Sequence, residues 1–259
     1  MAKSKPDLNK PNTQPVPAQP KSLVSTTGYF AWSRDPAVSL FAVLPLWILY
    51  EGLRLKLSPS ERNGAEVLLL EAFKRLGPVG AYVPRIGLAV LVLLALRSVL
   101  QRSIPWARVM VVIALEGMIY GLLLGPVASA LSSGAARLAA AAIDPRLMQN
   151  MVASLGAGIF EELVFRLLLM SALFWLWLRA VGSLGLPKWV AGAAAVICSA
   201  VAFSWFHHLW GEPILRSVFL FRTMAGVILG LLFWFRGYGV CVYTHAMYDI
   251  YLYLTQYRP

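Results

Sequence analysis

Long apolar stretches alternate with short polar segments along this chain, and the pattern predicts membrane-spanning helices. Roughly 20 apolar residues suffice for a helix to cross the hydrocarbon core of a bilayer. Seven stretches meet or approach this length, at residues 36–53, 84–100, 106–127, 148–178, 189–210, 217–235 and 239–254. An Ala-rich segment at residues 131–143 is shorter and gives an eighth candidate. We therefore expect an all-α, polytopic membrane protein with about seven to eight transmembrane helices.

One further segment has an amphipathic helical pattern. Between residues 63 and 76, charged side chains alternate with an apolar set that recurs at the spacing of one helix face. Such a helix lies in the membrane interface, with its apolar side towards the lipid. The apolar set consists of Ala65, Leu68, Leu69, Ala72, Phe73 and Leu76.

The pattern divides the chain into three parts. Residues 1–27 are polar and hold five of the 16 prolines, which predicts a disordered tail, since such a segment cannot bury enough apolar area to offset its ordering entropy. Residues 28–146 are expected to form N-terminal membrane helices with the interfacial helix. Residues 147–259 are expected to form a second helix bundle, in which the polar residues concentrate.

Composition supports the membrane assignment. The chain of 259 residues is 59% hydrophobic and only 14% charged. Its net charge of +11 is scattered between the apolar segments, which favours contact with anionic lipids and argues against nucleic acid as a partner. The two cysteines, Cys198 and Cys241, belong to no metal-binding spacing and are interpreted as small core residues.

Three charged residues interrupt the apolar stretch at residues 148–178. A charge at the centre of such a helix costs roughly 2.5 to 3.5 kcal/mol on insertion scales, so each needs a partner. Glu162 and Arg166 are four residues apart, the spacing of an ion pair on one helix face, while Glu161 points about 100° away. One carboxylate is thus expected to pair with Arg166, leaving the other available. The pair could also serve only to orient helices.

All three histidines fall in the last predicted spans. His207 follows Phe203 by four residues, and Asp249 follows His245 by four, so each pair shares a helix face. We expect Glu161, His207, His245 and Asp249 to meet in one polar pocket, since each is costly to hold in lipid. The roles of His208 and of Glu116, in the third span, stay open.

These residues form three motifs with a family resemblance. Glu161-Glu162-Leu-Val-Phe-Arg166 resembles EExxxR, Phe203-Ser-Trp-Phe-His207 resembles FxxxH, and His245-Ala-Met-Tyr-Asp249 resembles HxxxN/D. In this order on apolar helices they resemble the CPBP (Abi) family of intramembrane proteases, which includes type II CaaX prenyl endopeptidases and bacteriocin-processing proteins. The resemblance covers about residues 148–251.

The resemblance implies an intramembrane endopeptidase of glutamic type. Glu161 and His207 would activate a water, Glu162 and Arg166 would shape the site, and His245 with Asp249 would face the oxyanion. Many members have Gly directly after the motif Arg, where this chain has Leu167. Many also have Asn at position 249, and an ionised Asp249 would repel an oxyanion.

Other functions are compatible with the same residues. No HExxH motif occurs, but His207, His245 and a carboxylate could bind zinc, as in a metalloprotease; otherwise no cofactor is expected. A transporter or scaffold could also hold buried charges, although no internal repeat is visible. The expected partners are membrane lipids and a peptide or protein substrate, with a CaaX-like end, a leader peptide or a C-terminal sorting tail as candidates. A bacterial inner membrane is the expected location, and the Lys and Arg distribution leaves the orientation open.

Overall fold

The computed structural model describes residues 28–56, 63–102, 104–132, 147–209 and 214–256. Within these ranges the chain forms helices joined by short turns, with no strand. The proposed disordered tail and most of the Ala-rich segment at residues 131–143 lie outside the described residues. The helices are α1 (Tyr29–Arg34), α2 (Pro36–Arg54), α3 (Gly64–Lys74), η1 (Gly77–Tyr82), α4 (Val83–Gln101), α5 (Trp106–Leu131), α6 (Leu147–Gly156), η2 (Ala157–Met170), α7 (Ser171–Ser183), α8 (Lys188–His208), α9 (Arg216–Arg236) and α10 (Tyr238–Gln256).

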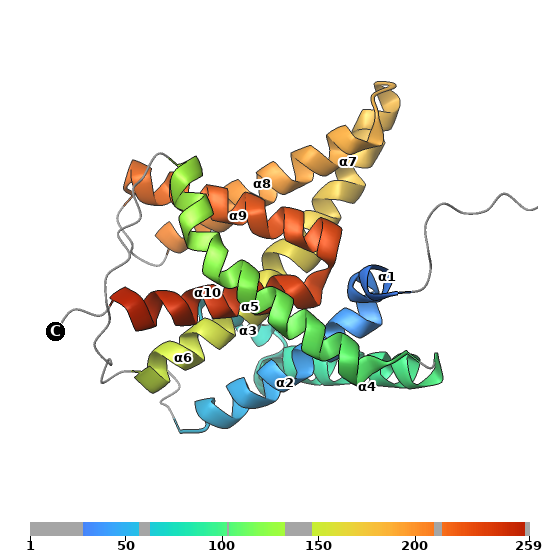
Figure 1. Ribbon diagram of the computed structural model, residues 1–259, viewed down its shortest axis with the longest axis vertical. Coiled ribbons are helices and arrows are strands. Elements are labelled where there is room, and N and C mark those ends of the chain that lie inside the picture. The colour runs from blue at the N-terminus through green and yellow to red at the C-terminus, as the bar shows by residue number, and fades with distance from the viewer. Residues whose placement is uncertain (1–27, 57–62, 103, 133–146, 210–213, 257–259) are drawn as a thin grey trace, which may run out of the picture.

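The predicted fold class is confirmed. Six helices in the described part of the chain are long and apolar enough to cross a membrane: α2, α4, α5, α8, α9 and one continuous helix from Met148 to Ser183 that joins α6, η2 and α7. The seventh predicted span, α10, lies in the middle of the bundle, where it packs against α2, α5, α6, α9 and η2 (Figure 1). Its residues Thr244 and His245 are therefore buried in protein, while the surrounding helices meet the lipid.

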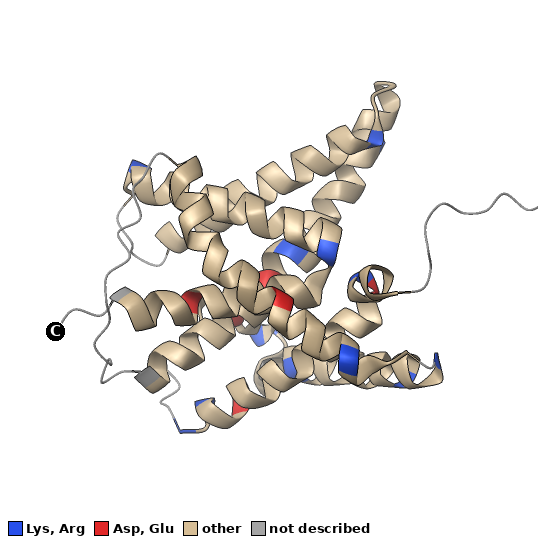
Figure 2. Cartoon of the chain, viewed as in Figure 1, with Lys and Arg blue, Asp and Glu red and all other residues tan. Residues whose placement is uncertain are grey.

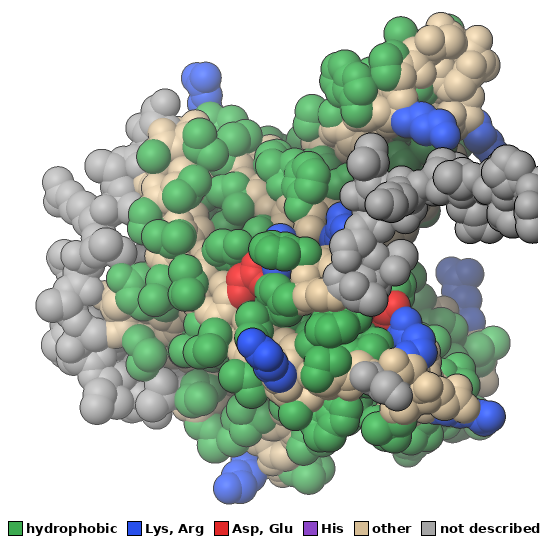
Figure 3. All heavy atoms as spheres, turned by 45° about the vertical axis from the view of Figure 1, so that its right-hand side comes forward, with side chains coloured by type: hydrophobic (Ala, Val, Ile, Leu, Met, Phe, Trp, Pro, Cys, Tyr) green, Lys and Arg blue, Asp and Glu red, His purple; other side chains and the backbone are tan. Residues whose placement is uncertain are grey.

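The outer surface is largely apolar. Large aliphatic and aromatic side chains point outwards on the spanning helices, among them Leu93 on α4, Ile119 on α5 and Trp189 on α8. Hydrophobic side chains cover most of the face shown in Figure 3, and long stretches of α7, α8 and α9 carry no charge in Figure 2. Such a surface is stable in contact with acyl chains, as an integral membrane protein requires.

Two glycines of α5 allow α10 to approach closely. A Cβ at Gly117 would lie 2.3 Å from the Cβ of Tyr243 on α10, and one at Gly121 would lie 2.9 Å from the Cβ of Met247 on α10. Any side chain at these two positions would push α5 and α10 apart. The small-residue spacing of Gly121 and Gly125 thus marks a helix contact, as expected for close packing in a membrane, and this contact holds α10, which carries His245, against α5.

The structure adds one short helix and one buried charge to the predicted elements, and it corrects the prediction for Cys198. The short helix α1 has no counterpart among the predicted elements. In the amphipathic helix α3, the charged residue Glu66 is buried, and it accepts hydrogen bonds from Tyr50 Oη at 2.5 Å and Arg85 Nη2 at 2.9 Å. Cys198 is exposed on α8, so only Cys241 is a core residue.

The start of α2 is fixed by an acidic cap. Asp35 Oδ1 accepts from the backbone N–H groups of Ala37 and Val38, each at 3.0 Å. Arg102 Nη1 lies 2.6 Å from Asp35 Oδ2, and this hydrogen bond lowers the pKa of the Asp35 carboxyl below its usual value. The pair also ties the end of α4 to the start of α2.

A second ion pair joins helices distant in sequence. Glu116 on α5 accepts two hydrogen bonds from Arg236 at the end of α9, with Nε to Oε1 at 2.6 Å and Nη2 to Oε2 at 2.7 Å. Tyr29 on α1 also donates to Glu116, and the Arg236 guanidinium lies 4.3 Å from the centre of the Phe30 ring. The sequence left the role of Glu116 open. In the structure its carboxylate links α5 to α9 and α1.

We expect Glu116→Gln to destabilise the fold, because Arg236 would keep its buried charge without a counter-charge. Breaking a buried pair costs about 3 kcal/mol or more, a fall in melting temperature of several degrees. Thermal unfolding of the purified protein in detergent measures this. Glu71→Gln is the control, since Glu71 and Lys74 form an exposed pair on α3 whose loss should be nearly neutral. Equal melting temperatures for both variants would contradict the assignment.

Candidate active site

The EExxxR motif lies in a π-helix. Residues Ala157–Met170 form η2, which continues α6 and is continued by α7. The sequence pattern predicted an ordinary α-helix there. In a π-helix the backbone bonds run from i to i+5, a rare arrangement that is frequent at functional sites. Hydroxyl groups of neighbouring helices donate to η2 carbonyls: Tyr238 Oη to Ile159 O at 3.0 Å and Ser199 Oγ to Phe165 O at 2.8 Å.

Glu162 is the centre of a fully buried polar network. Its Oε1 accepts from Arg166 Nη1 at 2.7 Å and from His245 Nδ1 at 2.6 Å. Its Oε2 lies 2.9 Å from Cys241 Sγ, which donates to it. The carboxylate is 0% exposed, so these three donors replace the water that it would otherwise need. The predicted ion pair of Glu162 and Arg166 is therefore present.

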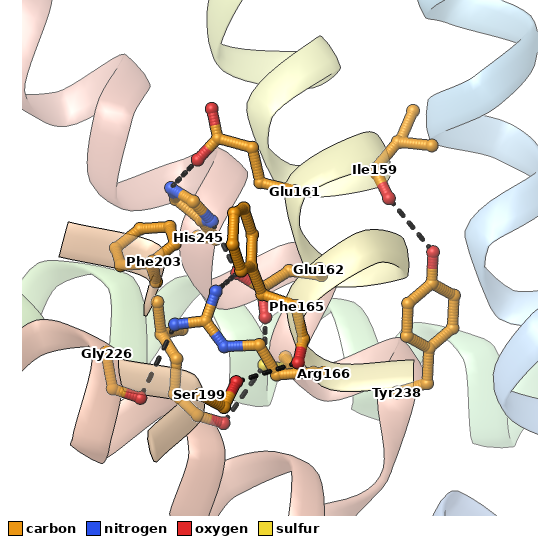
Figure 4. Close-up of polar contacts among 12 residues, drawn as sticks. Ile159, Glu161, Glu162, Phe165, Arg166, Ser199, Phe203, Gly226, Tyr238 and His245 are labelled. Atoms are coloured by element: carbon orange, nitrogen blue, oxygen red, sulfur yellow. Dashed lines mark hydrogen bonds and ion pairs between the residues drawn. The ribbon is translucent and has the colours of Figure 1, made fainter. Parts of the chain in front are cut away.

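Arg166 is held by more than its carboxylate partner. Its guanidinium carbon lies 4.2 Å from the centre of the Phe203 ring, which allows a cation–π contact. Its Nη2 points to Gly226 O at 3.4 Å (Figure 4). Gly226 packs directly on α8, because a Cβ there would lie 3.0 Å from the Cα of Ala200. The pair thus joins η2 to α8 and α9.

Glu161 has a different environment from its neighbour. Its Oε1 accepts from Asn63 Nδ2 at 2.8 Å. Its Oε2 is buried without a hydrogen-bond partner within the described residues, and it lies 3.7 Å from His207 Nε2 and 3.9 Å from His245 Nε2. In Figure 4, His245 lies between Glu161 and Glu162. One oxygen of Glu161 is therefore held in place, while the other faces two imidazoles.

The two histidines are oriented by their Nδ1 atoms. His207 Nδ1 lies 2.9 Å from Phe203 O, and a carbonyl can only accept, so Nδ1 carries the proton. His245 Nδ1 in the same way donates to the Glu162 carboxylate. Each ring therefore directs Nε2 to Glu161, free to take or give a proton.

Asp249 completes the predicted set. Its Oδ2 lies 3.7 Å from His245 Nε2, so Glu161, His207, His245 and Asp249 are brought together from η2, α8 and α10. They line one cavity of about 530 Å³, together with apolar side chains of α5, α9 and α10. His208 does not line it: its ring stacks on Phe219 at 5.9 Å. The cavity offers acidic and imidazole groups beside an apolar wall, which suits a peptide segment.

Some polar residues near this site were not predicted, and three of them contact the glutamates or bring a charge to the cavity. Asn63 contacts Glu161 directly, Cys241 contacts Glu162, and Arg222 on α9 lines the cavity. Asn63 precedes Gly64 at the start of an amphipathic pattern, which indicates a helix cap. The pattern does not predict which residue of another helix Asn63 contacts. Cys241 sits in an apolar run, where a thiol looks like any small core residue.

The histidines and carboxylates of the cavity are residue types that can bind a metal. Within the described residues, no group of three or more His, Cys, Asp or Glu side chains has an arrangement that could hold a metal ion. The Nδ1 atoms of both histidines are engaged by protein acceptors, so a metal would have to use the two Nε2 atoms together with carboxylate oxygens of Glu161 or Asp249.

A comparison with known protein families identifies the class. The all-helical bundle with its buried polar cavity defines an integral membrane protein with an internal site. Residues 144–251 match the family described as type II CAAX prenyl endopeptidase Rce1-like. The resemblance seen in the three motifs is thus confirmed over these residues, and the match supports a CAAX-type intramembrane endopeptidase, that is, a hydrolase acting on a peptide substrate at the membrane. No curated protein and no solved structure matches the chain.

The unequal environments of the two glutamates predict unequal effects on stability. Glu162→Gln leaves Arg166 and His245 without the carboxylate that they share, so we expect a cost of about 3 to 5 kcal/mol. Glu161→Gln should be nearly neutral, because its amide oxygen still accepts from Asn63. Melting temperatures of the two purified variants measure the difference. The double variant Glu162→Gln/Arg166→Met should recover part of the loss, since it removes the unpaired charge; a larger loss for Glu161→Gln would show that the roles are reversed.

Proposed function

We propose that the protein is a glutamic-type intramembrane endopeptidase, in which Glu161 and His207 activate a water that attacks a peptide bond. The observation that carries this proposal is the buried Oε2 of Glu161, which faces the Nε2 atoms of both histidines at 3.7 and 3.9 Å on the wall of the cavity. A general base needs an oxygen that is held in place and that accepts no hydrogen bond from the protein, so that it can accept a proton from water. Glu161 meets this description and Glu162 does not.

The spacing of Glu161 and His207 suits a shared water. Two polar atoms 3.7 Å apart are too far for a direct hydrogen bond, but a water about 2.8 Å from each can bridge them. Glu161 would take a proton from this water, the hydroxide would attack the peptide carbonyl carbon, and the proton would pass to the leaving nitrogen. His207 would hold the water and assist the transfer, since its Nδ1 is engaged by Phe203 O and its Nε2 faces Glu161.

His245 and Asp249 would act on the oxyanion. When the His245 ring carries both protons, its Nε2–H can donate to the oxygen that becomes negative, while Nδ1 remains held by Glu162. Asp249 lies beside this atom, 3.7 Å from Nε2. As a carboxylate Asp249 accepts only, so it would donate to the oxyanion in its protonated form.

The substrate is proposed to be a membrane protein with a C-terminal sorting tail, processed in a bacterial inner membrane. CaaX-like ends and leader peptides are the competing substrates. The experiment that decides is a proteomic comparison of cells that make the wild-type protein with cells that make Glu161→Gln. Membrane proteins that keep an uncut terminus in the variant identify the substrate class, and identical termini in both strains would contradict the proposed protease activity.

We expect Glu161→Gln to lower kcat by about 10² to 10⁴-fold, the usual contribution of a general base. The measurement uses the purified protein in lipid vesicles and the best-cleaved peptide from an internally quenched peptide library. Glu71→Gln, an exposed change on α3, is the matched control and should keep wild-type activity. A Glu161→Gln protein that cleaves at the wild-type rate would exclude Glu161 as the base.

Asp249→Asn separates the metal-free mechanism from a zinc mechanism. If Asp249 must donate a proton to the oxyanion, the amide can replace it, so activity should persist and extend to higher pH. If the site holds zinc, the amide should weaken metal binding and activity should be lost. The pH profile of kcat for Asp249→Asn, together with metal analysis and chelator treatment of the wild type, distinguishes the two. Stoichiometric zinc with an inactive Asp249→Asn protein would overturn the metal-free mechanism.

A further inference from the structure

Asn63 is a polar residue in the cavity that none of the three motifs includes. It precedes α3, far outside the matched residues 144–251, yet its Nδ2 donates to Glu161 Oε1 at 2.8 Å and it lines the cavity. A contact between residues 98 positions apart requires that α3 be brought to η2. The amphipathic helix is therefore more than a membrane anchor.

The amide of Asn63 has its orientation fixed by the helix that it caps. Its Oδ1 accepts from the backbone N–H of Ala65 at 2.8 Å, as an N-cap residue does. Because an N–H needs an acceptor, the oxygen must face Ala65, and the NH₂ group must face Glu161. Capping and contact with Glu161 thus use opposite ends of one rigid amide.

The surroundings hold Asn63 at this distance. Gly156, at the end of α6, permits the approach, because a Cβ there would lie 3.2 Å from Asn63 Cβ and 3.1 Å from Tyr50 Cε2. One turn further along α3, Glu66 is tied to Tyr50 on α2 and Arg85 on α4. The first turn of α3 is therefore fixed to two other helices as well as to the site.

We propose that Asn63 is a positioning residue of the active site. It binds Oε1 of Glu161, so that the carboxylate cannot rotate and Oε2 stays directed at His207 and His245. This inference rests on the proposed role of Glu161 as the base. The charged groups that share the cavity with Glu161 are His207 on α8, Arg222 on α9, and His245 and Asp249 on α10. In the described part of the chain, the hydrogen bond from Asn63 holds Oε1 of Glu161 among these groups.

Asn63→Ser tests the role without removing the cap. Serine caps a helix about as well as asparagine, but its shorter side chain cannot hold Ala65 N and reach Glu161 together. We expect kcat to fall about 10- to 100-fold, the value of one charge-assisted hydrogen bond, with KM close to wild type. The assay uses the full chain in lipid vesicles and the best-cleaved peptide of the internally quenched library.

A control separates capping from positioning. Asp35→Ala removes the cap of α2, distant in sequence from the motif helices, so it should lower the melting temperature and leave kcat unchanged.

Exchanging the two side chains tests the contact between Asn63 and Glu161 itself. Asn63→Asp alone places two carboxylates together and should lower the melting temperature. The double variant Asn63→Asp/Glu161→Gln restores an amide–carboxylate pair, so it should recover the melting temperature without recovering activity.

The outcomes of this inference and of the proposed function are distinct. Wild-type kcat in Asn63→Ser, with Glu161→Gln inactive, would overturn the positioning role alone. Wild-type kcat in Glu161→Gln would overturn the proposed function and the inference with it. Additive changes in melting temperature in the residue exchange would show that Asn63 and Glu161 are not coupled, which also overturns the inference.

Discussion

The requirement to neutralise the Glu162 carboxylate inside the membrane organises the site. A buried ion without partners costs far more than one hydrogen bond can recover, and Glu162 meets this cost with three donors, from Arg166 on its own helix and from His245 and Cys241 on α10. No single helix could supply them all. The network therefore stabilises the bundle only when η2 and α10 lie side by side, which is also the arrangement that brings His245 to Glu161.

Close helix packing makes this network possible. The α10 helix can approach η2 and α5 because both helices present glycines to it. A Cβ at Gly158 on η2 would lie 2.7 Å from Ala246 Cβ, and Gly117 and Gly121 on α5 allow an equally close contact with α10. In lipid there is little hydrophobic drive between helices, so such contacts and interhelical hydrogen bonds carry the association. The glycine contacts therefore bring the helices close enough for the polar groups of the site to form their hydrogen bonds.

The sequence predicted the parts of this structure that depend on local spacing. Apolar length gave the spanning helices, and the four-residue spacings of Glu162 with Arg166 and of His245 with Asp249 gave pairs that the structure brings within 2.7 and 3.7 Å. It did not predict what depends on tertiary contact. Asn63 lies 98 residues from Glu161, the burial of Glu66 depends on Arg85 from another helix, and the π-helical backbone of η2 has no periodicity that an α-helical pattern would reveal. The catalytic roles of the site residues remain predictions.

Two adjacent glutamates can carry different tasks because their surroundings differ. Glu162 has both oxygens engaged, by Arg166, His245 and Cys241, so any proton transfer there would break the bundle's central network. Glu161 has one oxygen held by Asn63 and the other directed at two imidazoles. Neighbouring acids separated in role by environment are a recurrent way to perform acid and base chemistry in one site. Asn63, which holds Glu161, is the N-cap of α3 and lies before the family-matched region. The different roles proposed for the two glutamates therefore depend on the N-terminal helices as well as on the three motifs.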